Sequence, residues 1–492
     1  MQSRRDQVQA YRFAQVRMQS ALVTGETDGL DVPLRRAGVS TFAGVMIAVL
    51  LLAVAGVIGL IRPGGKTGWA DGGVLVVEKE TGARYVYDSN DRALHPVLNY
   101  TSARLLLNEP EISVRRFSAN SLAGVARGRA LGIAGLPDSL PDDDHLVSGP
   151  WLTCAGRDSS SGPQSITVSG GYRPTGRAVG ADEAVLVQVT SGDLYVLWNN
   201  TRLKVIDMDV TGAAFDWSRS DAVTVPDAWV NAIPAGPDLV APHLSGIGRK
   251  VPYAALDGTA IFLGQIFKVD AQAGQPDRYY VAVDDGLARI STFVAQLMLA
   301  DPYQRAAYYN GDQSPVPFST STETIARIPS SRVVAPGGFP ADRPDLIRAG
   351  SLPDGASSAV CAAYDDPSGA STASRIYLGG RGPGSWQPPR EEAGTGGVNV
   401  VVPPGEGALI RPLAHAGQDG GSTFLLTDGG VKYPVPSAKT KEVLGYKDAG
   451  RAPVPAGVAA LIPTGPALSE EAAYRAGASV ISPSAQASAA VS

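Results

Sequence analysis

The sequence predicts a single-pass membrane protein whose large exported domain consists of repeated short α/β units rich in β-strands. Three observations lead to this fold class. One segment near the N-terminus is long and apolar enough to cross a membrane, the 492 residues include 57 glycines and 37 prolines, and a hairpin pattern recurs along the chain. Frequent glycine and proline favour short elements joined by turns over long helices.

The apolar segment runs from residue 38 to residue 61 and contains no charged side chain. It exceeds the roughly 20 residues that a helix needs to span a bilayer. The alternative is a cleaved signal peptide, which has a shorter apolar stretch closer to the first residue. Arg35 and Arg36 precede the segment and Arg62 follows it, and we expect these three arginines to flank the membrane anchor.

The charge of the flanks predicts the orientation of the chain. Residues 1–37 carry six arginines and four acidic side chains, which gives a net charge of +2. Positive flanks stay in the cytosol, so we expect a cytosolic N-terminus and an exported domain beyond residue 61. Because the whole chain has a net charge of −5, the remainder carries −7, and this mildly acidic balance argues against a nucleic-acid partner.

Residues 4–23 are expected to form a cytosolic helix that ends at Gly25, followed by a linker to residue 37. One face of this helix is apolar and is bordered by arginines. The apolar residues are Val8, Tyr11, Met18 and Leu22, and the arginines are Arg4, Arg5 and Arg12. A basic amphipathic helix near a membrane lies on anionic lipid or docks onto a cytosolic partner, and a solvated helix without a partner is the alternative.

Beyond the anchor, hairpin signals recur with irregular spacing after a linker at 62–73. We expect repeats at 74–145, 181–245, 246–335 and 416–468, central core segments at 146–180 and 336–415, and a flexible tail at 469–492. The firmest internal match is between residues 225–239 and 454–468, where seven of fifteen positions agree. The shared residues are proline, glycine and aliphatic types, which predicts a packing unit that is used more than once.

The two cysteines, Cys154 and Cys361, both follow the anchor and occupy comparable places in the two halves of the domain. An even number of cysteines in an oxidising compartment favours one disulfide between them. Two free, buried thiols are the alternative.

No motif predicts a catalytic, cofactor-binding or metal-binding residue. The segment 64–67 ends like a phosphate-binding loop, but Leu60 stands where that loop needs its first glycine. The four histidines are widely spread without the spacing of a zinc site, and the acidic run at 142–144 lacks the alternation of a calcium loop. We therefore expect no cofactor.

Several long segments resemble the EccB family, a core membrane component of the actinobacterial type VII (ESX) secretion systems. The resemblance begins with the tail and the anchor. It continues through LHPVLNYTSARLLL at 94–107, GRALGIAGLPDSLP at 128–141 and WLTCA at 151–155, and it covers nearly the whole chain.

The resemblance implies a scaffold subunit of an inner-membrane translocation complex that supports protein export. Its implied partners are the motor ATPase EccC, the subunits EccD and EccE, other EccB copies and membrane lipid. It also implies an exported domain of four similar repeats around a central β core, with quasi-two-fold symmetry and a disulfide. Some family members carry an ATPase label, so an ATP-hydrolysing component is one alternative, and a cell-wall-binding anchor is another.

Overall fold

The structure, a computed structural model, describes residues 3–479 apart from several segments. The segments outside the description are 26–32, 62–67, 72, 158–163, 254–258, 271–275, 309–314, 332–336, 353, 356–357, 380–396 and 419–420. The chain forms two compact units. The first comprises Met1–Pro96 and Ile112–Arg129, and the second comprises Val97–Glu111 and Ala130–Ser492.

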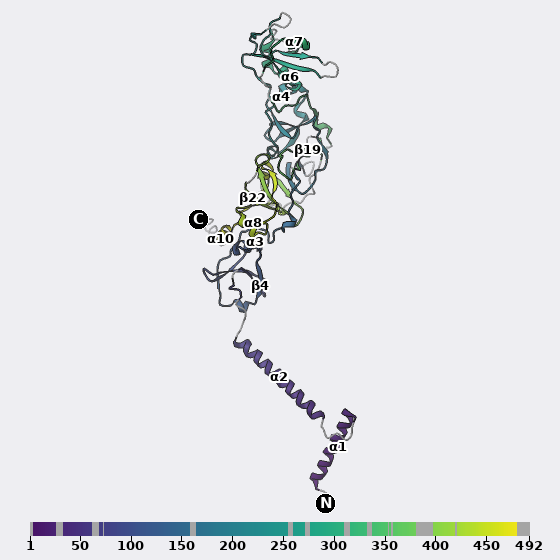
Figure 1. Cartoon of the computed structure of the whole chain (residues 1–492), viewed down its shortest axis with the longest axis vertical. Helices are drawn as coiled ribbons and strands as arrows, with labels where there is room; N and C mark the ends of the chain where they lie inside the picture. Colours follow the sequence, from purple (N-terminus) through teal and green to yellow (C-terminus); the bar gives the residue numbers. More distant parts are fainter. Residues whose placement is uncertain are drawn as a thin grey trace, which may run out of the picture. The chain divides into compact units, whose positions relative to one another are not determined.

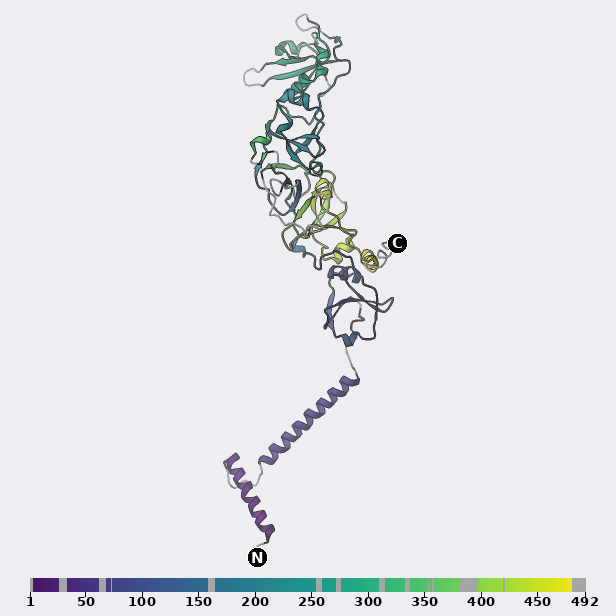
Figure 2. The same cartoon turned by 180° about the vertical axis from the view of Figure 1, so that it is seen from behind.

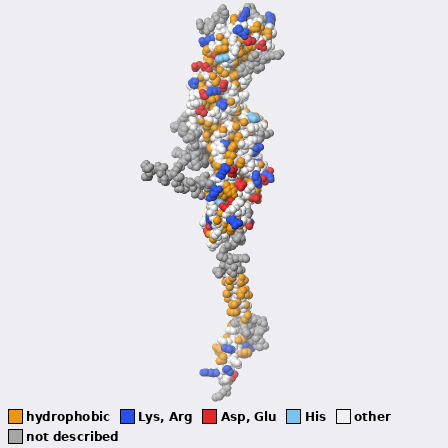
Figure 3. Space-filling model, turned by 90° about the vertical axis from the view of Figure 1, so that its left-hand side faces the viewer, with side chains coloured by type: hydrophobic (Ala, Val, Ile, Leu, Met, Phe, Trp, Pro, Cys, Tyr) orange, Lys and Arg blue, Asp and Glu red, His pale blue; other side chains and the backbone are white. Residues whose placement is uncertain are grey.

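The first unit starts with two helices (Figure 1). Helix α1 (Arg4–Thr24) begins with a capping box between Ser3 and Asp6 and ends where Gly25 adopts the left-handed conformation, with φ of 73°. Helix α2 (Pro33–Ile61) continues without a break (Figure 2). Its segment Gly38–Val57 is apolar, long enough to cross a membrane and entirely unburied. Figure 3 shows hydrophobic side chains covering this helix. One candidate membrane helix is thus confirmed.

The rest of the first unit is a five-stranded sheet with the order β4-β1-β2-β3-β5. Its strands are β1 (Val74–Glu78), β2 (Arg84–Asp88), β3 (Ala93–Pro96), β4 (Ser113–Phe117) and β5 (Ala126–Arg127). Strands β1, β2 and β3 form an antiparallel meander, whereas β4 pairs parallel to β1 and β5 pairs parallel to β3. The short helix η1 (Ala119–Leu122) follows β4, and its Leu122 packs in the core of the sheet with Val76 and Leu94.

Three sheets of the second unit share one strand order, in which the third, second, first and fourth strands lie side by side. The second sheet contains β9 (Glu183–Val189), β10 (Leu194–Trp198), β11 (Thr201–Val205) and β12 (Val223–Val225). The third contains β13 (Ile266–Val269), β14 (Arg278–Val283), β15 (Gly286–Ile290) and β16 (Phe318–Thr320). The fourth contains β21 (Gly407–Leu413), β22 (Thr423–Thr427), β23 (Lys432–Val435) and β24 (Ala452–Pro455). In each sheet the last strand runs parallel to the first.

A short helix joins the third and fourth strands of each of these sheets. These helices are α4 (Met208–Phe215), α6 (Thr292–Ala300) and α8 (Ala438–Val443), and α3 (Tyr100–Leu107) has the same place in the chain after β3. Helices α4 and α6 pack together, because the rings of Phe215 and Phe293 stack with centroids 4.3 Å apart. The described helices also include α7 (Thr322–Ala326) and α10 (Glu470–Ser479).

The central sheet has the order β20-β7-β6-β18-β19-β8. Its strands are β6 (Trp151–Arg157), β7 (Gln164–Gly170), β8 (Arg177–Ala178), β18 (Val360–Tyr364), β19 (Arg375–Leu378) and β20 (Val398–Val401). Side chains of β18 alternate between two clusters. Val360, Ala362 and Tyr364 enter the large core, and Cys361 and Ala363 enter a smaller cluster on the other face.

The two segments that match in sequence form short helices that pack against each other. Helix α5 (Asp227–Ala232) follows β12, and α9 (Ala456–Leu461) follows β24. A Cβ atom on Gly457 would lie 2.7 Å from Cα of Ala232, so only glycine permits this approach. Trp229 of α5 is fully buried, and its indole Nε1 donates to the carbonyl oxygen of Thr153 at 3.1 Å.

Several boundaries differ from the sequence-based expectations. The fourth sheet begins at Gly407 rather than near residue 416, because β21 pairs with both β22 and β24. The expected core segment 336–415 also contains β17 (Asp345–Ile347), which pairs with β9 of the second sheet. Helix α3 starts at Tyr100 because the side chain of Asn99 accepts a hydrogen bond from the backbone of Ser102 and caps it.

Candidate functional site

Helix α1 exposes the apolar face that the sequence predicts. Val8 is 54% exposed, Tyr11 70%, Met18 66% and Leu22 82%. Burying such side chains is favourable, at about 1.5–3 kcal/mol for a fully buried Val, Leu or Met. The arrangement can therefore bind an apolar surface. The sequence interpretation missed Phe13, which is 65% exposed outside this face and lies against the guanidinium of Arg17.

The flanks of the anchor are only partly described. Arg35 and Arg36 lie in the first turns of α2. Arg62 and the segment 64–67, which resembles the end of a phosphate-binding loop, lie outside the described residues.

A disulfide joins Cys154 of β6 to Cys361 of β18. The two cysteines lie opposite each other in the antiparallel pairing of these strands, and both are buried. Because 207 residues separate them in the chain, this bond links the first and second halves of the β-rich domain in the middle of the central sheet. The alternative of two free thiols does not apply.

An acidic side chain that sequence reasoning missed connects the second sheet to the segment after β17. Asp221 ends η3 (Arg219–Asp221), and its Oδ2 accepts hydrogen bonds from the backbone N–H of Ser218 at 2.8 Å and from Nη1 of Arg348 at 2.8 Å. Burial alone would raise the pKa of the Asp221 carboxyl, but these donors outweigh burial and hold that pKa below its usual value.

Lys432 of β23 is buried and has a structural role. Its Nζ donates to the carbonyl oxygens of Ala459 and Ile462 at the end of α9. The carbonyl oxygen of Ala459 also accepts from the backbone N–H of Ile462 at 3.3 Å, so the lysine adds a charged donor where the last carbonyls of a helix lack their usual partners. Burial lowers the pKa of Lys432.

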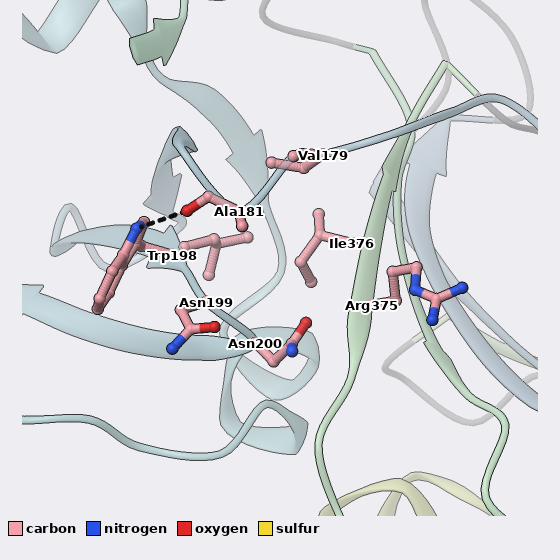
Figure 4. Close-up of a pocket in the computed structure, with 9 residues that line it drawn as sticks. Val179, Ala181, Trp198, Asn199, Asn200, Arg375 and Ile376 are labelled. Atoms are coloured by element: carbon pink, nitrogen blue, oxygen red, sulfur yellow. Dashed lines mark hydrogen bonds between the residues drawn. The ribbon is translucent and has the colours of Figure 1, made fainter. Parts of the chain in front are cut away.

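A pocket of about 200 Å³ lies between the second sheet and the central sheet (Figure 4). Trp198 ends β10, and its indole Nε1 donates to the carbonyl oxygen of Ala181 at 3.2 Å. Asn199 and Asn200 form the following turn with φ of 44° and 65°, the left-handed conformation that two-residue hairpins require. Arg375 lines the other side, but its guanidinium points away from Trp198 (Figure 4).

A second pocket of about 450 Å³ lies beside the central sheet. Its lining combines both signs of charge, since Arg173 and Arg375 lie with Asp365 and Asp366. Nη1 of Arg375 is 3.7 Å from Oδ2 of Asp365. Neither lining contains a histidine, a cysteine or a lysine, and both offer polar contacts.

His243 and His145 have structural surroundings. His243 contacts Asp301, with 2.6 Å between its Nε2 and Oδ2, and stacks on Tyr303. His145 contacts Asp144 in the exposed run at 142–145. Among the described residues, neither histidine contacts a serine or a cysteine in the way that a hydrolytic triad requires.

The five sheets and the single long apolar helix among the described residues define a β-rich chain with one candidate membrane-spanning helix near its N-terminus. Residues 1–482 match the family model described as "Type VII secretion system ESX-1, transport TM domain B". The chain therefore belongs to the EccB family of type VII secretion systems.

Similar proteins bear consistent names. The chain is 28% identical to the "ESX-3 secretion system ATPase EccB3" of Mycobacterium tuberculosis strain H37Rv, over 94% of this chain and 88% of that protein. It is 25% identical to the "ESX-1 secretion system ATPase EccB1" of Mycolicibacterium smegmatis strain MKD8, over 95% of this chain and 94% of that protein.

Two solved structures share the fold. A chain in an EccB3 dimer from the ESX-3 core complex has a TM-score of 0.62 at 25% identity, and the match covers 81% of this chain and 99% of that chain. A chain in an intact ESX-5 inner membrane complex has a TM-score of 0.61 at 23% identity, and the match covers 96% and 95% of the two chains.

Proposed function

We propose that this protein is a scaffold subunit of a type VII secretion complex in the inner membrane, where it supports protein export. The observation that carries the proposal is the match of residues 1–482 to the EccB family model. The matched residues include the first helix, α1, the last helix, α10, and all five sheets. In this proposal α2 crosses the membrane, α1 lies in the cytosol, and the β-rich domain lies on the export side. The arginines before the apolar segment of α2 support this orientation.

We also propose that four of the five sheets are repeats of one unit around the central sheet. The repeats would span 74–145, 181–245, 246–335 and a fourth segment that starts at Gly407. Their common strand order supports this reading, as does the parallel return of the fourth strand in each of them. The packing of α5 against α9 supports a quasi-two-fold relation between the second and fourth repeats.

The proposed partners are the motor ATPase EccC, the subunits EccD and EccE, further copies of this chain and membrane lipid. The exposed face of α1 supports a cytosolic contact, since a helix with four uncovered apolar side chains gains free energy when a partner covers them. The similar EccB3 chain was solved as a dimer, which supports contacts between copies of this chain as well.

Deleting residues 4–23 tests the docking role of α1. We expect the shortened chain to insert into the membrane and keep its exported domain folded, but to lose co-purification with its partners and to stop secretion. The double substitution Met18→Glu and Leu22→Glu should act in the same direction, while Gln9→Glu on the opposite side of α1 is the matched control. Normal assembly and secretion after the deletion would refute the docking role.

The names of the relatives favour a second candidate function, ATP hydrolysis. We propose that the exported domain lacks this activity, because hydrolysis requires phosphates held by backbone donors, a placed magnesium ion and an oriented water. The two described pockets supply neither a lysine nor a phosphate-binding loop.

Residues 70–492, produced in a host without a secretion system, should show no steady ATP turnover above a buffer control. This host removes traces of the motor subunit, which would hydrolyse ATP strongly. Steady turnover that one acidic-to-alanine substitution abolishes, with the melting temperature unchanged, would replace the scaffold proposal with an enzymatic one.

A further inference from the structure

The turn between β2 and β3 brings one imidazole and two carboxylates together. The ligand atoms of Asp88, Asp91 and His95 all lie within 4.8 Å of one another. Asp88 ends β2, Asp91 lies in the turn, and His95 lies in β3. His95 is only 5% exposed, whereas Asp91 is exposed, so a buried nitrogen faces oxygens that solvent reaches.

The hydrogen bonds of His95 determine which ring nitrogen carries its proton. Nδ1 lies 2.9 Å from the carbonyl oxygen of Arg129, which can only accept, so Nδ1 must donate. In the neutral ring Nε2 then has a lone pair, and this lone pair meets Oδ2 of Asp91 at 2.8 Å. A proton or a metal ion shared by these two atoms would remove the repulsion between their lone pairs.

The charges around the cluster favour a divalent metal ion over a single proton. A proton on Nε2 would give one positive charge against the two carboxylates, whereas a divalent ion with a neutral imidazole gives a balanced site. Among the described residues, the only ion pair of either carboxylate is the contact between Asp91 and His95. No arginine or lysine in that part of the chain therefore pairs with Asp88 or Asp91.

The surroundings hold the imidazole in this orientation. A Cβ atom on Gly128 would lie 2.2 Å from Cε1 of His95, so glycine at this position makes room for the ring. One oxygen of each carboxylate is fixed by the turn, because Oδ1 of Asp88 accepts from the backbone of Asn90 and Oδ1 of Asp91 accepts from that of Ala93. A histidine that ligates a metal commonly donates its other N–H to a backbone carbonyl, as His95 does to Arg129.

We propose that Asp88, Asp91 and His95 form a binding site for a divalent transition-metal ion such as Zn²⁺, a function separate from the scaffold role. In a tetrahedral site, nitrogen and oxygen ligands bound at about 2.0–2.2 Å lie roughly 3.4 Å apart, so Nε2 and Oδ2 would separate slightly to bind the ion. Calcium and magnesium favour sites made of oxygen alone, so the imidazole selects against them. The bound ion would tie the β2–β3 turn to the segment at 128–129 in the first sheet.

The test is Zn²⁺ binding by the full chain in detergent, measured by competition with a chromophoric chelator at pH 7. The wild type should bind one equivalent that millimolar Mg²⁺ does not displace, and its melting temperature should rise with Zn²⁺. Asp88→Asn should weaken binding at least 10-fold. His95→Gln should abolish binding, and Asp88→Asn keeps the test valid if that variant fails to fold.

Asp144→Asn is the matched control, since Asp144 contacts His145 in a second cluster of Asp142, Asp144 and His145 that is fully exposed. This variant should bind Zn²⁺ like the wild type. Two results would overturn the proposal: no saturable binding by the wild type, or equal affinities for the wild type and Asp88→Asn. Either result would leave a protonated imidazole paired with Asp91.

Discussion

At the residue scale, Asp221 shows how one buried carboxylate holds two parts of the β-rich domain together. Its Oδ2 accepts from Ser218 near the second sheet and from Arg348, more than a hundred residues later in the chain. The side chain of Asp221 is 10% exposed, whereas the second partner of Arg348, Asp216, is 93% exposed. The guanidinium of Arg348 therefore contacts one buried carboxylate, Asp221, and one solvated carboxylate, Asp216. Only the contact with Asp221 should contribute to stability.

Replacing Asp221 by Asn should lower the free energy of unfolding by about 1–3 kcal/mol, because it removes the buried charged acceptor to which Ser218 and Arg348 donate. Asp216→Asn should change it little. Chemical denaturation of the two variants measures both effects, and equal losses would contradict this account.

The folded pKa of Asp221 lies below the usual value of 3.8, so its contribution to stability has a defined pH range. The contribution is fully present above pH 3.8 and is lost as the pH falls through the lower pKa of the folded state. The stability difference between wild type and Asp221→Asn should therefore shrink in acid. If the stability difference between the two proteins stayed constant down to the pH of acid unfolding, the lowered pKa of Asp221 would not be its cause.

Few of the residues to which the structure gives a role could be found from the sequence. The apolar face of α1 could, since helical spacing alone places its four side chains together. Asp221 and Arg348 could not, because only the pairing of β17 with β9 brings their segments close. Asp88, Asp91 and His95 lie within eight residues of each other, yet their spacing matches no standard metal motif, and the hydrogen bond to Arg129 depends on the fold.

At the element scale, hairpins were predicted well because each needs only a local signal. The strands β1, β2, β4 and β10 and the helix α6 appear where apolar alternation and turn residues indicate them. Strand β21 was missed. It contains Pro412, which normally argues against a strand, but Pro412 lies opposite Val454 in the parallel pairing with β24.

The disulfide between β6 and β18 supports the central sheet, so its removal should destabilise the β-rich domain. A double substitution of Cys154 and Cys361 by alanine opens a loop of more than 200 residues. The chain-entropy model then gives a loss on the order of 5 kcal/mol, as an upper estimate. Denaturant unfolding measures the loss.

Reduction provides the control for this prediction. A thiol reductant should lower the stability of the wild type toward that of the double variant and should leave the double variant unchanged. Equal stability of the oxidised wild type and the double variant would show that the bond does not support the sheet.

At the scale of the whole molecule, the arrangement of the central sheet could not be predicted from the sequence. Its middle strands, β6 and β18, come from the two halves of the chain and bury their side chains in a core shared with the second and fourth sheets. The match between residues 225–239 and 454–468 indicated a repeated packing unit. It did not indicate that the two copies pack against each other through Gly457 and Ala232, since this contact depends on every intervening connection.

The central claim is that this EccB-family chain works as a scaffold within a membrane complex. The most direct measurement is mild-detergent extraction of native membranes that contain a tagged full-length chain, followed by size-exclusion chromatography and mass spectrometry of the tagged fraction. The account predicts that the chain elutes in a large complex with the motor ATPase, other membrane subunits and more than one copy of itself. Elution as a single protein, with its exported domain sedimenting on isolated cell wall, would contradict the scaffold role and favour a cell-wall anchor.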